Sequence, residues 1–160
     1  MPNPNWETDE DGNPINPPAQ EPRGQRGIMA NLHYLMGTDR EAAAAIQPAL
    51  NHRMQAIRLV DGDPGEVQID FRRHRLTLWD RGQSCCESRY IRTDDDLAYF
   101  AGAMLRNIEI SAAEEIADSV VHDIQFLRII TDRGTITFVN HNEHNGCYGG
   151  FVIDARLEEI

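Results

Sequence analysis

A polar segment near the C-terminus gathers many of the side chains in this sequence that could do chemistry. Residues 140–151 (NHNEHNGCYGGF) contain three Asn, two His, one Glu, one Cys, three Gly and two aromatic residues. Amide, imidazole and carboxylate groups at this density can bind a polar ligand, and imidazole and thiol groups can also ligate metal ions. The flanking residues 134–139 and 151–153 are apolar or β-branched and read as strands. The segment is therefore predicted to be a loop between two strands and the place of the functional site.

Metal binding is one chemistry that this segment suggests. Zinc prefers His and Cys ligands in a tetrahedral arrangement, so His141 and His144 could form a site with Cys85, Cys86 or Cys147. The paired Cys-x-x-Cys spacing of many zinc sites is missing. The simpler interpretation is that the His and Asn side chains satisfy backbone groups in a long turn. No cofactor is therefore predicted, although His141 and His144 remain the candidate metal ligands.

An activated thiol is a second chemistry, since Cys85 and Cys86 adjoin Glu87. A cysteine nucleophile needs a neighbouring base and a lowered pKa, which a helix N-terminus or nearby positive charge can provide. Here residues 82–84 lead into a predicted strand, where a buried and unreactive cysteine is the simpler interpretation. No catalytic residue is therefore assigned.

Three consecutive acids, Asp94–Asp96, could bind Mg²⁺ or Ca²⁺ through their oxygens. A helix is predicted from the capping residue Thr93 to about Met104, and acids in a first helical turn favour the positive end of the helix dipole. The second interpretation explains the three acids without any ion.

The basic run of residues 72–75 (RRHR) is the other charged cluster that could bind a ligand. Arg side chains bind phosphate in a bidentate manner, and Tyr90 or Tyr148 could stack on a base while the Gly149-Gly150 backbone approaches it. Such residues would form a nucleotide-sized pocket. The alternative is a solvated hairpin turn, since exposed charges commonly have no ligand.

The composition limits the classes of partner. The 160 residues include 26 acidic and 15 basic side chains, and the formal net charge of -11 disfavours non-specific binding to nucleic acid. No run of about 18 apolar residues is present, so no membrane span is predicted. A secretory signal is not recognisable, and three cysteines do not make a disulfide framework. An intracellular protein with reduced thiols is expected.

The chain is predicted to have three parts. Residues 1–28 contain six of the eight prolines and almost no apolar residues, so this arm is predicted to be extended and disordered, or ordered by a partner. Residues 29–53 form a helical lead-in, because Thr38 and Glu41 make a capping box before four alanines and Pro48 weakens or ends the helix. Residues 54–160 are predicted to form one β-rich globular domain.

The fold class follows from the pattern of strands. Two Asp-Arg-Gly triplets, at residues 80–82 and 132–134, suit short hairpins with Gly in the left-handed conformation. The fold is predicted to be α+β, a mainly antiparallel sheet of about six to eight strands with one or two helices packed on one face. The segments that read as strands are Met54–Val60, Val67–Phe71, Arg75–Trp79, Glu87–Thr93, Asn107–Ile110, Ile124–Thr131 and Thr135–His141.

Three motifs give the sequence a family resemblance. They are QSCCESRY at residues 83–90, TDDDL at 93–97, and HNEHNG at 141–146 followed by GGF at 149–151. In these motifs the chain resembles a group of small domains of unassigned function from tailed bacteriophages and prophage-carrying bacteria, over about residues 54–154. That group has Tyr-Tyr where this chain has Cys147-Tyr148, which implies that a thiol at 147 is dispensable. The resemblance implies a phage setting and one domain, without an activity or catalytic residues.

The leading prediction is a non-enzymatic phage or prophage accessory protein of the host cytoplasm that binds a small ligand or a partner. The ligand could be a nucleotide signal of host defence. One alternative is a virion structural or assembly protein that docks through its N-terminal arm, as a homo-oligomer or within a phage assembly. The other is a metal-assisted hydrolase with Glu143 as base. The predicted ligand-binding residues are Cys86, Glu87, Tyr90, Asn140, His141, Asn142, Glu143, His144, Asn145, Tyr148 and Gly149.

Overall fold

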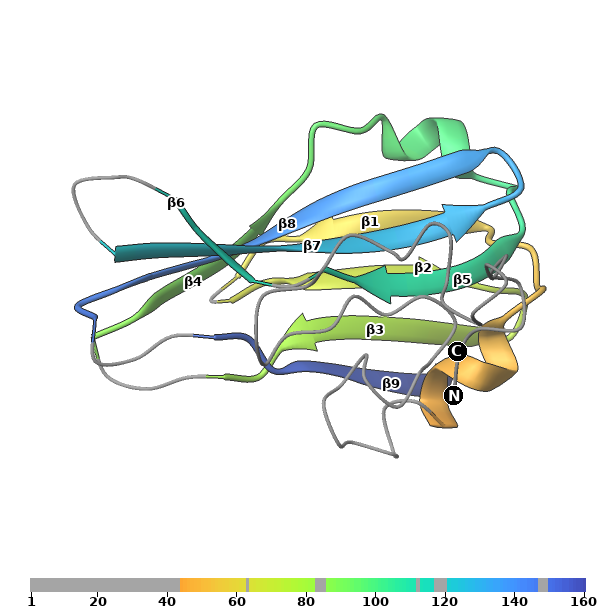
Figure 1. The fold of residues 1–160 in the computed structure, drawn as a ribbon. Helices are drawn as coiled ribbons and strands as arrows, with labels where there is room; N and C mark the ends of the chain where they lie inside the picture. The colour runs from red at the N-terminus through yellow and green to blue at the C-terminus, as the bar shows by residue number, and fades with distance from the viewer. Residues whose placement is uncertain (1–43, 63, 83–85, 112, 117–120, 147–149) are drawn as a thin grey trace, which may run out of the picture.

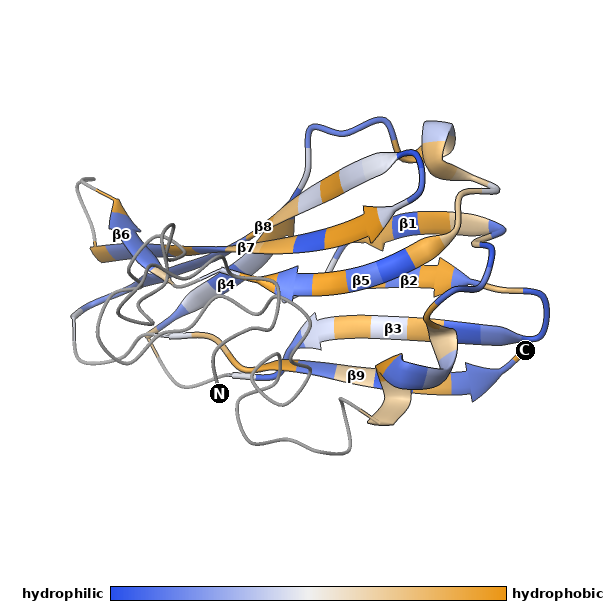
Figure 2. Ribbon diagram, turned by 45° about the vertical axis from the view of Figure 1, so that its right-hand side comes forward, coloured by the Kyte–Doolittle hydropathy of each residue, from blue (hydrophilic) through white to orange (hydrophobic). Residues whose placement is uncertain are grey.

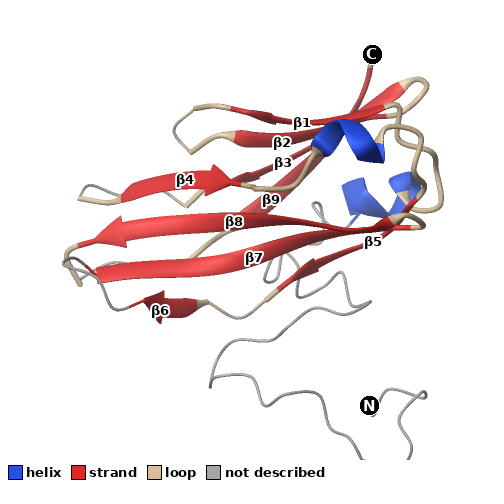
Figure 3. Ribbon diagram, turned by 90° about the horizontal axis from the view of Figure 1, so that it is seen from above, coloured by secondary structure: helices blue, strands red, loops and turns tan. Residues whose placement is uncertain are grey.

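Two antiparallel β-sheets lie face to face and enclose the core (Figures 1 and 3). The computed structural model describes residues 44–62, 64–82, 86–111, 113–116, 121–146 and 150–160. One sheet has four strands in the order β1-β2-β3-β9, and the other has the order β4-β8-β7-β5 with β6 also paired to β7. The predicted antiparallel β architecture is confirmed. The α+β description fits only loosely, because the described helical segments are short.

The four-stranded sheet consists of β1 (Ala56–Val60), β2 (Glu66–Asp70), β3 (His74–Asp80) and β9 (Ile153–Glu159). Alternation with period two places Val67 and Ile69 opposite Leu78 and Leu76, and all four side chains are fully buried. The turn between β2 and β3 is the predicted basic hairpin, closed by a hydrogen bond from Phe71 N to His74 O of 2.7 Å. The alternating side chains fix which face of this sheet meets the core.

The five-stranded sheet is built around the long hairpin of β7 (Val121–Thr131) and β8 (Gly134–His144). Its turn confirms one of the two predicted Asp-Arg-Gly hairpins, because Thr131 pairs with Gly134 and Gly134 has a φ of 122°. On either side of this hairpin the sheet is completed by β4 (Ser88–Arg92), β5 (Leu105–Ile110) and β6 (Glu114–Ile116).

The other Asp-Arg-Gly triplet is not a hairpin, and that prediction is wrong. After β3 the chain leaves the four-stranded sheet and continues into β4, which pairs with β8 in the other sheet. Asp80 turns the chain by accepting a hydrogen bond from Gly82 N (3.0 Å) through its carboxylate. The triplet is therefore a crossing point between the two sheets.

The predicted helix from Thr93 to about Met104 is also wrong. Only the 3-10 turn η2 (Leu97–Phe100) forms, with Asp96 as its N-cap, and Gly102 has a φ of 86°. Thr93 and Asp95 instead bond to Thr137 of β8 through their side chains: Thr93 Oγ1 donates to Thr137 O, and Asp95 Oδ2 accepts from Thr137 N. Side chains that bond to nearby backbone compete with helix formation, and here they extend the edge of a strand.

The N-terminal region contributes to the core where it is described. The predicted arm 1–28 and most of the lead-in 29–53 lie outside the described residues. Residues 44–46 are helical and continue into the 3-10 turn η1 (Gln47–Ala49), in which Ile46 and Ala49 are buried in the core cluster. In the described part of the chain, no helix has the length and hydropathy needed to cross a membrane.

The interior changes character along the sandwich. Hydrophobic and hydrophilic residues alternate along several strands (Figure 2). On the inward face of β8, Ile136 and Phe138 are fully buried in the apolar core, and Asn140 and Asn142 follow on the same face, 1% and 0% exposed. The end of the sandwich towards Asp80 therefore has a polar interior.

Candidate functional site

The first five residues of the predicted loop, Asn140–His144, are part of strand β8 and pair with β7. Successive side chains of a strand point to opposite faces. Asn140, Asn142 and His144 therefore share the face of the buried Phe138, and His141 and Glu143 lie on the opposite, outer face. The predicted loop is wrong for these five residues, because they form a strand that divides their side chains between two faces.

Strands β4 and β8 contain predicted ligand-binding residues from two of the sequence motifs, and they are neighbours in the structure. Strand β4 pairs with β8 so that Arg89 lies opposite Asn142 and Tyr90 lies opposite His141. The alternation of β4 divides its residues in the same way, since Arg89 is buried and Ser88 is exposed. Two polar clusters result, one between the sheets and one on the outer surface.

A buried ion-pair network forms the foundation of the inner cluster. Arg89 Nη1 lies 2.7 Å from Asp80 Oδ2, and Arg89 Nη2 lies 3.0 Å from Glu87 Oε2. The three side chains are 5%, 2% and 1% exposed. Burial by itself lowers the pKa of Arg89, but the hydrogen bonds and charges of Asp80 and Glu87 raise that pKa above its ordinary value. Arg89 is therefore a fixed cation that joins β4 to the end of β3.

The same network holds the segment that leads into β9. Arg89 Nη1 also donates to Gly150 O (3.0 Å), and Asp80 Oδ1 accepts from Val152 N (3.0 Å). A Cβ atom at Gly82 would lie 2.6 Å from Arg89 Nη1. Gly82 is therefore needed here for the space that it leaves to the guanidinium.

Among the described residues, three amide side chains between the sheets have hydrogen-bonding atoms without a partner. Asn142 Nδ2 lies 3.3 Å from Glu87 Oε1 and 3.2 Å from Gly150 O, but its Oδ1 is buried without a partner. Asn140 has neither donor nor acceptor partner for its side-chain amide. Gln125 lies opposite Asn140 in the β7–β8 pairing, and its Oε1 is also buried without a partner. Three acceptors and one donor group are therefore available in one part of the interior.

His144 is bonded within the protein. Its Nε2 lies 2.8 Å from Asp123 Oδ2, and its Nδ1 accepts a hydrogen bond from Gly146 N at 3.0 Å. An Nδ1 that accepts carries no proton, so the Nε2 proton is the one donated to Asp123. Both ring nitrogens hold the end of β8 to β7, which leaves neither for a metal ion.

The outer cluster is a row of aromatic rings across three strands. Tyr90 stacks on His141 with ring centroids 4.5 Å apart and an interplanar angle of 10°, and Arg92 lies over Tyr90 at 5.0 Å. His141 Nδ1 lies 2.9 Å from His122 Nε2. Burial, then the charges of His122 and Arg92, lower the pKa of His141, while Glu143 opposes that shift. Neutral His141 is favoured in this row.

The predicted metal ligands and cysteines lie in different surroundings. Among them, no group of three or more His, Cys, Asp or Glu side chains is placed to hold a metal ion. Glu143 Oε1 lies 3.8 Å from His122 Nδ1 on the outer face. Cys86 is exposed with a φ of 70°, so the prediction of a buried strand cysteine is wrong at this position. Cys85 and Cys147 lie outside the described residues.

The remaining predicted site residues are distributed as follows. Asn145 is exposed beyond the end of β8, and Tyr148 and Gly149 lie outside the described residues. The predicted pocket of Tyr90 with the basic run 72–75 does not form, because His74 begins β3 and the polar cluster lies at its other end, about 20 Å away at 3.3 Å per residue. Arg75 is bound to Asp70, at 2.7 Å.

Sequence reasoning missed Asp80, Arg89 and Gln125. Arg89 alternates with Tyr90 and Ile91 within a short strand, and a charged residue at an inward position of a strand was the available signal. The Arg89 side chain can be assigned to the inward face only if it is known which side of β4 faces the second sheet. That assignment needs the tertiary structure.

One family model, described as a domain of unknown function (DUF7448), matches residues 48–153. The matched range agrees with the expected uncharacterised domain at about residues 54–154, and it begins within the described N-terminal turn. The curated proteins and the solved structures yield no match to this chain.

Proposed function

The chain belongs to the DUF7448 family, whose description names no function, and from its own residues we propose that the domain binds a small polar ligand without catalysing a reaction. The ligand lies at the polar end of the sandwich, against Asn140, Asn142 and Gln125. One observation carries the proposal: the Asn140 side chain is 1% exposed, and neither of its amide atoms has a hydrogen-bond partner among the described residues. Leaving a buried amide unpaired costs about 1–3 kcal/mol, which a ligand with matching groups recovers.

The free atoms determine the chemistry of the ligand. Asn140 offers one donor group and one acceptor, and Gln125 Oε1 and Asn142 Oδ1 add two further acceptors. The ligand therefore presents several N–H or O–H groups. The fixed charges nearby are those of Asp80, Glu87 and Arg89, so a further anion is disfavoured between the sheets. A neutral, donor-rich group such as a nucleobase or a sugar fits these requirements.

A nucleotide is the proposed ligand, with its base between the sheets and its phosphate outside. An Asn side chain can bond to the edge of an adenine in a bidentate manner, which matches the free donor and acceptor of Asn140. The resemblance of the three sequence motifs to phage and prophage domains supports a setting in the infected host cell. In that setting the protein sequesters a nucleotide signal of host defence, as an accessory protein.

Calorimetry of the full chain against nucleobases, nucleosides and linear and cyclic nucleotides tests the proposal. Binding is expected in the wild type and is lost in Asn140→Leu, which keeps the shape of the side chain and removes its amide. The matched control His141→Gln changes the next residue of β8 on the outer face, and it retains binding. The proposal would be contradicted if the wild type bound none of these compounds and no simple sugar, or if Asn140→Leu bound with unchanged affinity.

A further inference from the structure

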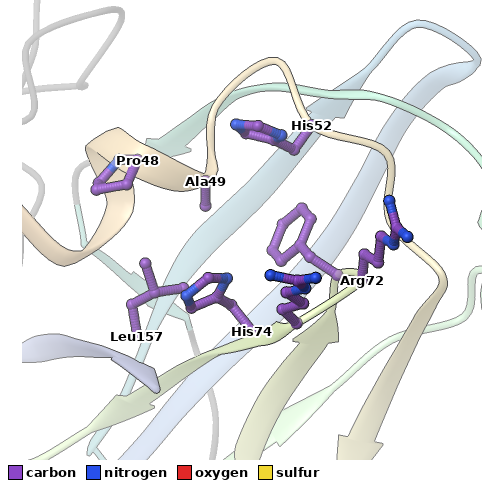
Figure 4. A pocket seen from close by; sticks show the side chains of 8 residues that line it. Pro48, Ala49, His52, Arg72, His74 and Leu157 are labelled. Atoms are coloured by element: carbon purple, nitrogen blue, oxygen red, sulfur yellow. The ribbon is translucent and has the colours of Figure 1, made fainter. Parts of the chain in front are cut away.

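A cavity lies at the other end of β3, away from the polar cluster. It has a volume of about 500 Å³ and lies between the N-terminal turn η1 and the β2–β3 hairpin (Figure 4). His74 begins β3 here, and Asp80 ends the strand at the polar cluster. The two places are about 20 Å apart at 3.3 Å per strand residue. None of the residues of the inner cluster described above lines the cavity.

One part of the cavity is apolar. Phe71 and Ala49 are 5% and 3% exposed and belong to the core cluster, and Leu157 of β9 packs against that cluster. Figure 4 shows Ala49 and Leu157 at the cavity, together with Pro48. These residues form a surface that can bind an apolar group, because removing apolar area from water is favourable.

The other part of the cavity is basic. Arg72, Arg73, His74 and His52 line it, and Arg72 and Arg73 are exposed at the hairpin turn. In the described part of the chain neither guanidinium has an acidic partner. By contrast, Arg58 and Arg75 are both bound to Asp70, at 2.9 and 2.7 Å.

Glu159 is an acidic residue next to this basic rim. Glu159 Oε1 lies 4.0 Å from His74 Nε2, and the Glu159 side chain is 88% exposed. Although the protein has a net charge of -11, its described residues place no acidic partner on the two neighbouring arginines at the mouth of the cavity. Paired Arg forks bind the oxygens of phosphate and carboxylate groups.

We propose that this cavity binds a small organic anion with an apolar body. The anionic head, a phosphate or a carboxylate, lies between Arg72 and Arg73, and the apolar body lies against Phe71, Ala49 and Leu157. A volume of about 500 Å³ is within the range of pockets for small molecules. The combination of charge and apolar surface distinguishes this ligand from inorganic anions and from neutral apolar molecules. This site is independent of the inner cluster and of the function proposed for the inner cluster.

Calorimetry on the full chain with phenyl phosphate and with benzoate tests the site, with inorganic phosphate and phenol as the two half-ligands. At least one of the two aromatic anions is expected to bind about tenfold or more tightly than either half-ligand, which corresponds to about 1.4 kcal/mol. The comparison of phenyl phosphate with benzoate identifies the preferred head. Equal affinity for inorganic phosphate, or no binding of either aromatic anion, overturns the proposal.

Variants locate the binding. Arg72→Gln/Arg73→Gln is expected to weaken binding of the preferred aromatic anion about tenfold or more, and because both residues are exposed, circular dichroism should show an unchanged fold. Arg156→Gln removes one charge from an exposed residue of β9 outside the cavity and keeps wild-type affinity. If the double variant unfolds, the single variant Arg72→Gln provides the same test. Unchanged affinity in the folded variant rejects the site.

Discussion

Asn140 and Asn142 occupy the same face of β8, yet their amides have different surroundings. Asn142 Nδ2 bonds to Glu87 and to the carbonyl of Gly150, whereas the Asn140 amide has no hydrogen-bond partner in the part of the chain that the structure describes. A buried polar group without a partner destabilises the fold, and a polar group that satisfies others stabilises it. The two residues therefore make a matched pair for separating stability from binding.

The unbound Asn140→Leu variant is expected to be more stable than the wild type by about 1–3 kcal/mol, because an unpaired buried amide is replaced by an apolar group of similar shape. Asn142→Leu is expected to be less stable by a similar amount, since Glu87 and Gly150 lose a donor. Urea denaturation of both variants measures the difference. Destabilisation of Asn140→Leu would show that its amide has a partner in solution.

The single residue Arg89 is expected to contribute strongly to the stability of the polar end of the sandwich. Arg89→Met leaves Asp80 and Glu87 buried without their cation, and the expected loss is about 3–5 kcal/mol. The triple variant Asp80→Asn/Glu87→Gln/Arg89→Met removes all three charges and should recover part of this loss. Chemical denaturation of the two variants provides the measurement. A loss below about 1 kcal/mol in Arg89→Met would mean that the ion pairs are solvated.

His141 makes the stability of the outer row depend on pH. Its pKa is lowered below the ordinary value of 6.5 by burial, then by His122 and Arg92, against the opposing charge of Glu143. The unfolded chain therefore takes up the proton at a higher pH than the folded chain. The contribution of neutral His141 to stability is complete above pH 6.5 and is lost as the pH falls through the lower folded-state pKa.

His141→Gln is accordingly expected to show a shallower loss of unfolding free energy than the wild type as the pH falls below 6.5. Gln keeps a polar side chain on the outer face but does not titrate. Denaturation midpoints at several pH values between about 5 and 7.5 measure the slope. Parallel curves for the wild type and the variant would exclude His141 as the titrating group.

At the scale of elements, the crossing from β3 to β4 couples the two sheets. Asp80 ends β3, Gly82 follows it, and Arg89 lies in β4. The space beside Gly82 is occupied by a guanidinium that Asp80 and Glu87 hold in place, so the guanidinium cannot shift freely to admit a methyl group. The crossing and the ion pairs therefore form one unit.

Gly82→Ala is expected to destabilise the protein by about 1–3 kcal/mol through this steric conflict. In the Arg89→Met background the same substitution should cost less, because the fixed guanidinium is gone. A double-mutant cycle by urea denaturation measures the coupling. Additive effects of the two substitutions would place the cost of Gly82→Ala in the backbone of the crossing instead.

At the scale of the whole molecule, the sandwich has two chemically different ends. One has a polar interior with unused amide atoms, and the other has an apolar cavity with a basic rim. An apolar core, with members such as Leu76, Leu78, Ile129 and Ile136, belongs to both sheets and separates the two ends. Close packing keeps such a core rigid, so both ends are held by the same framework.

The sequence alone determined the β character of the domain, because period-two alternation and turn residues are local signals. It predicted the β2–β3 and β7–β8 hairpins and their approximate strands. The helix predicted from Thr93 to Met104 was wrong because Thr93 and Asp95 bond to Thr137 in a distant strand. A capping signal followed by helix formers does not reveal such a partner.

Only the tertiary structure decided what the polar residues at 140–144 do. A run of Asn, His and Glu reads as a loop, because polar residues are ordinarily solvated. Here β4 and β7 pair with both edges of this segment and make it a strand, so alternation sends Asn140 inwards and His141 outwards. The pairing partners are far away in the sequence, and so are Asp80 and Gly150, which complete the inner cluster. Residue types therefore indicated where polar chemistry is concentrated, and long-range strand pairing determined which of those side chains meet.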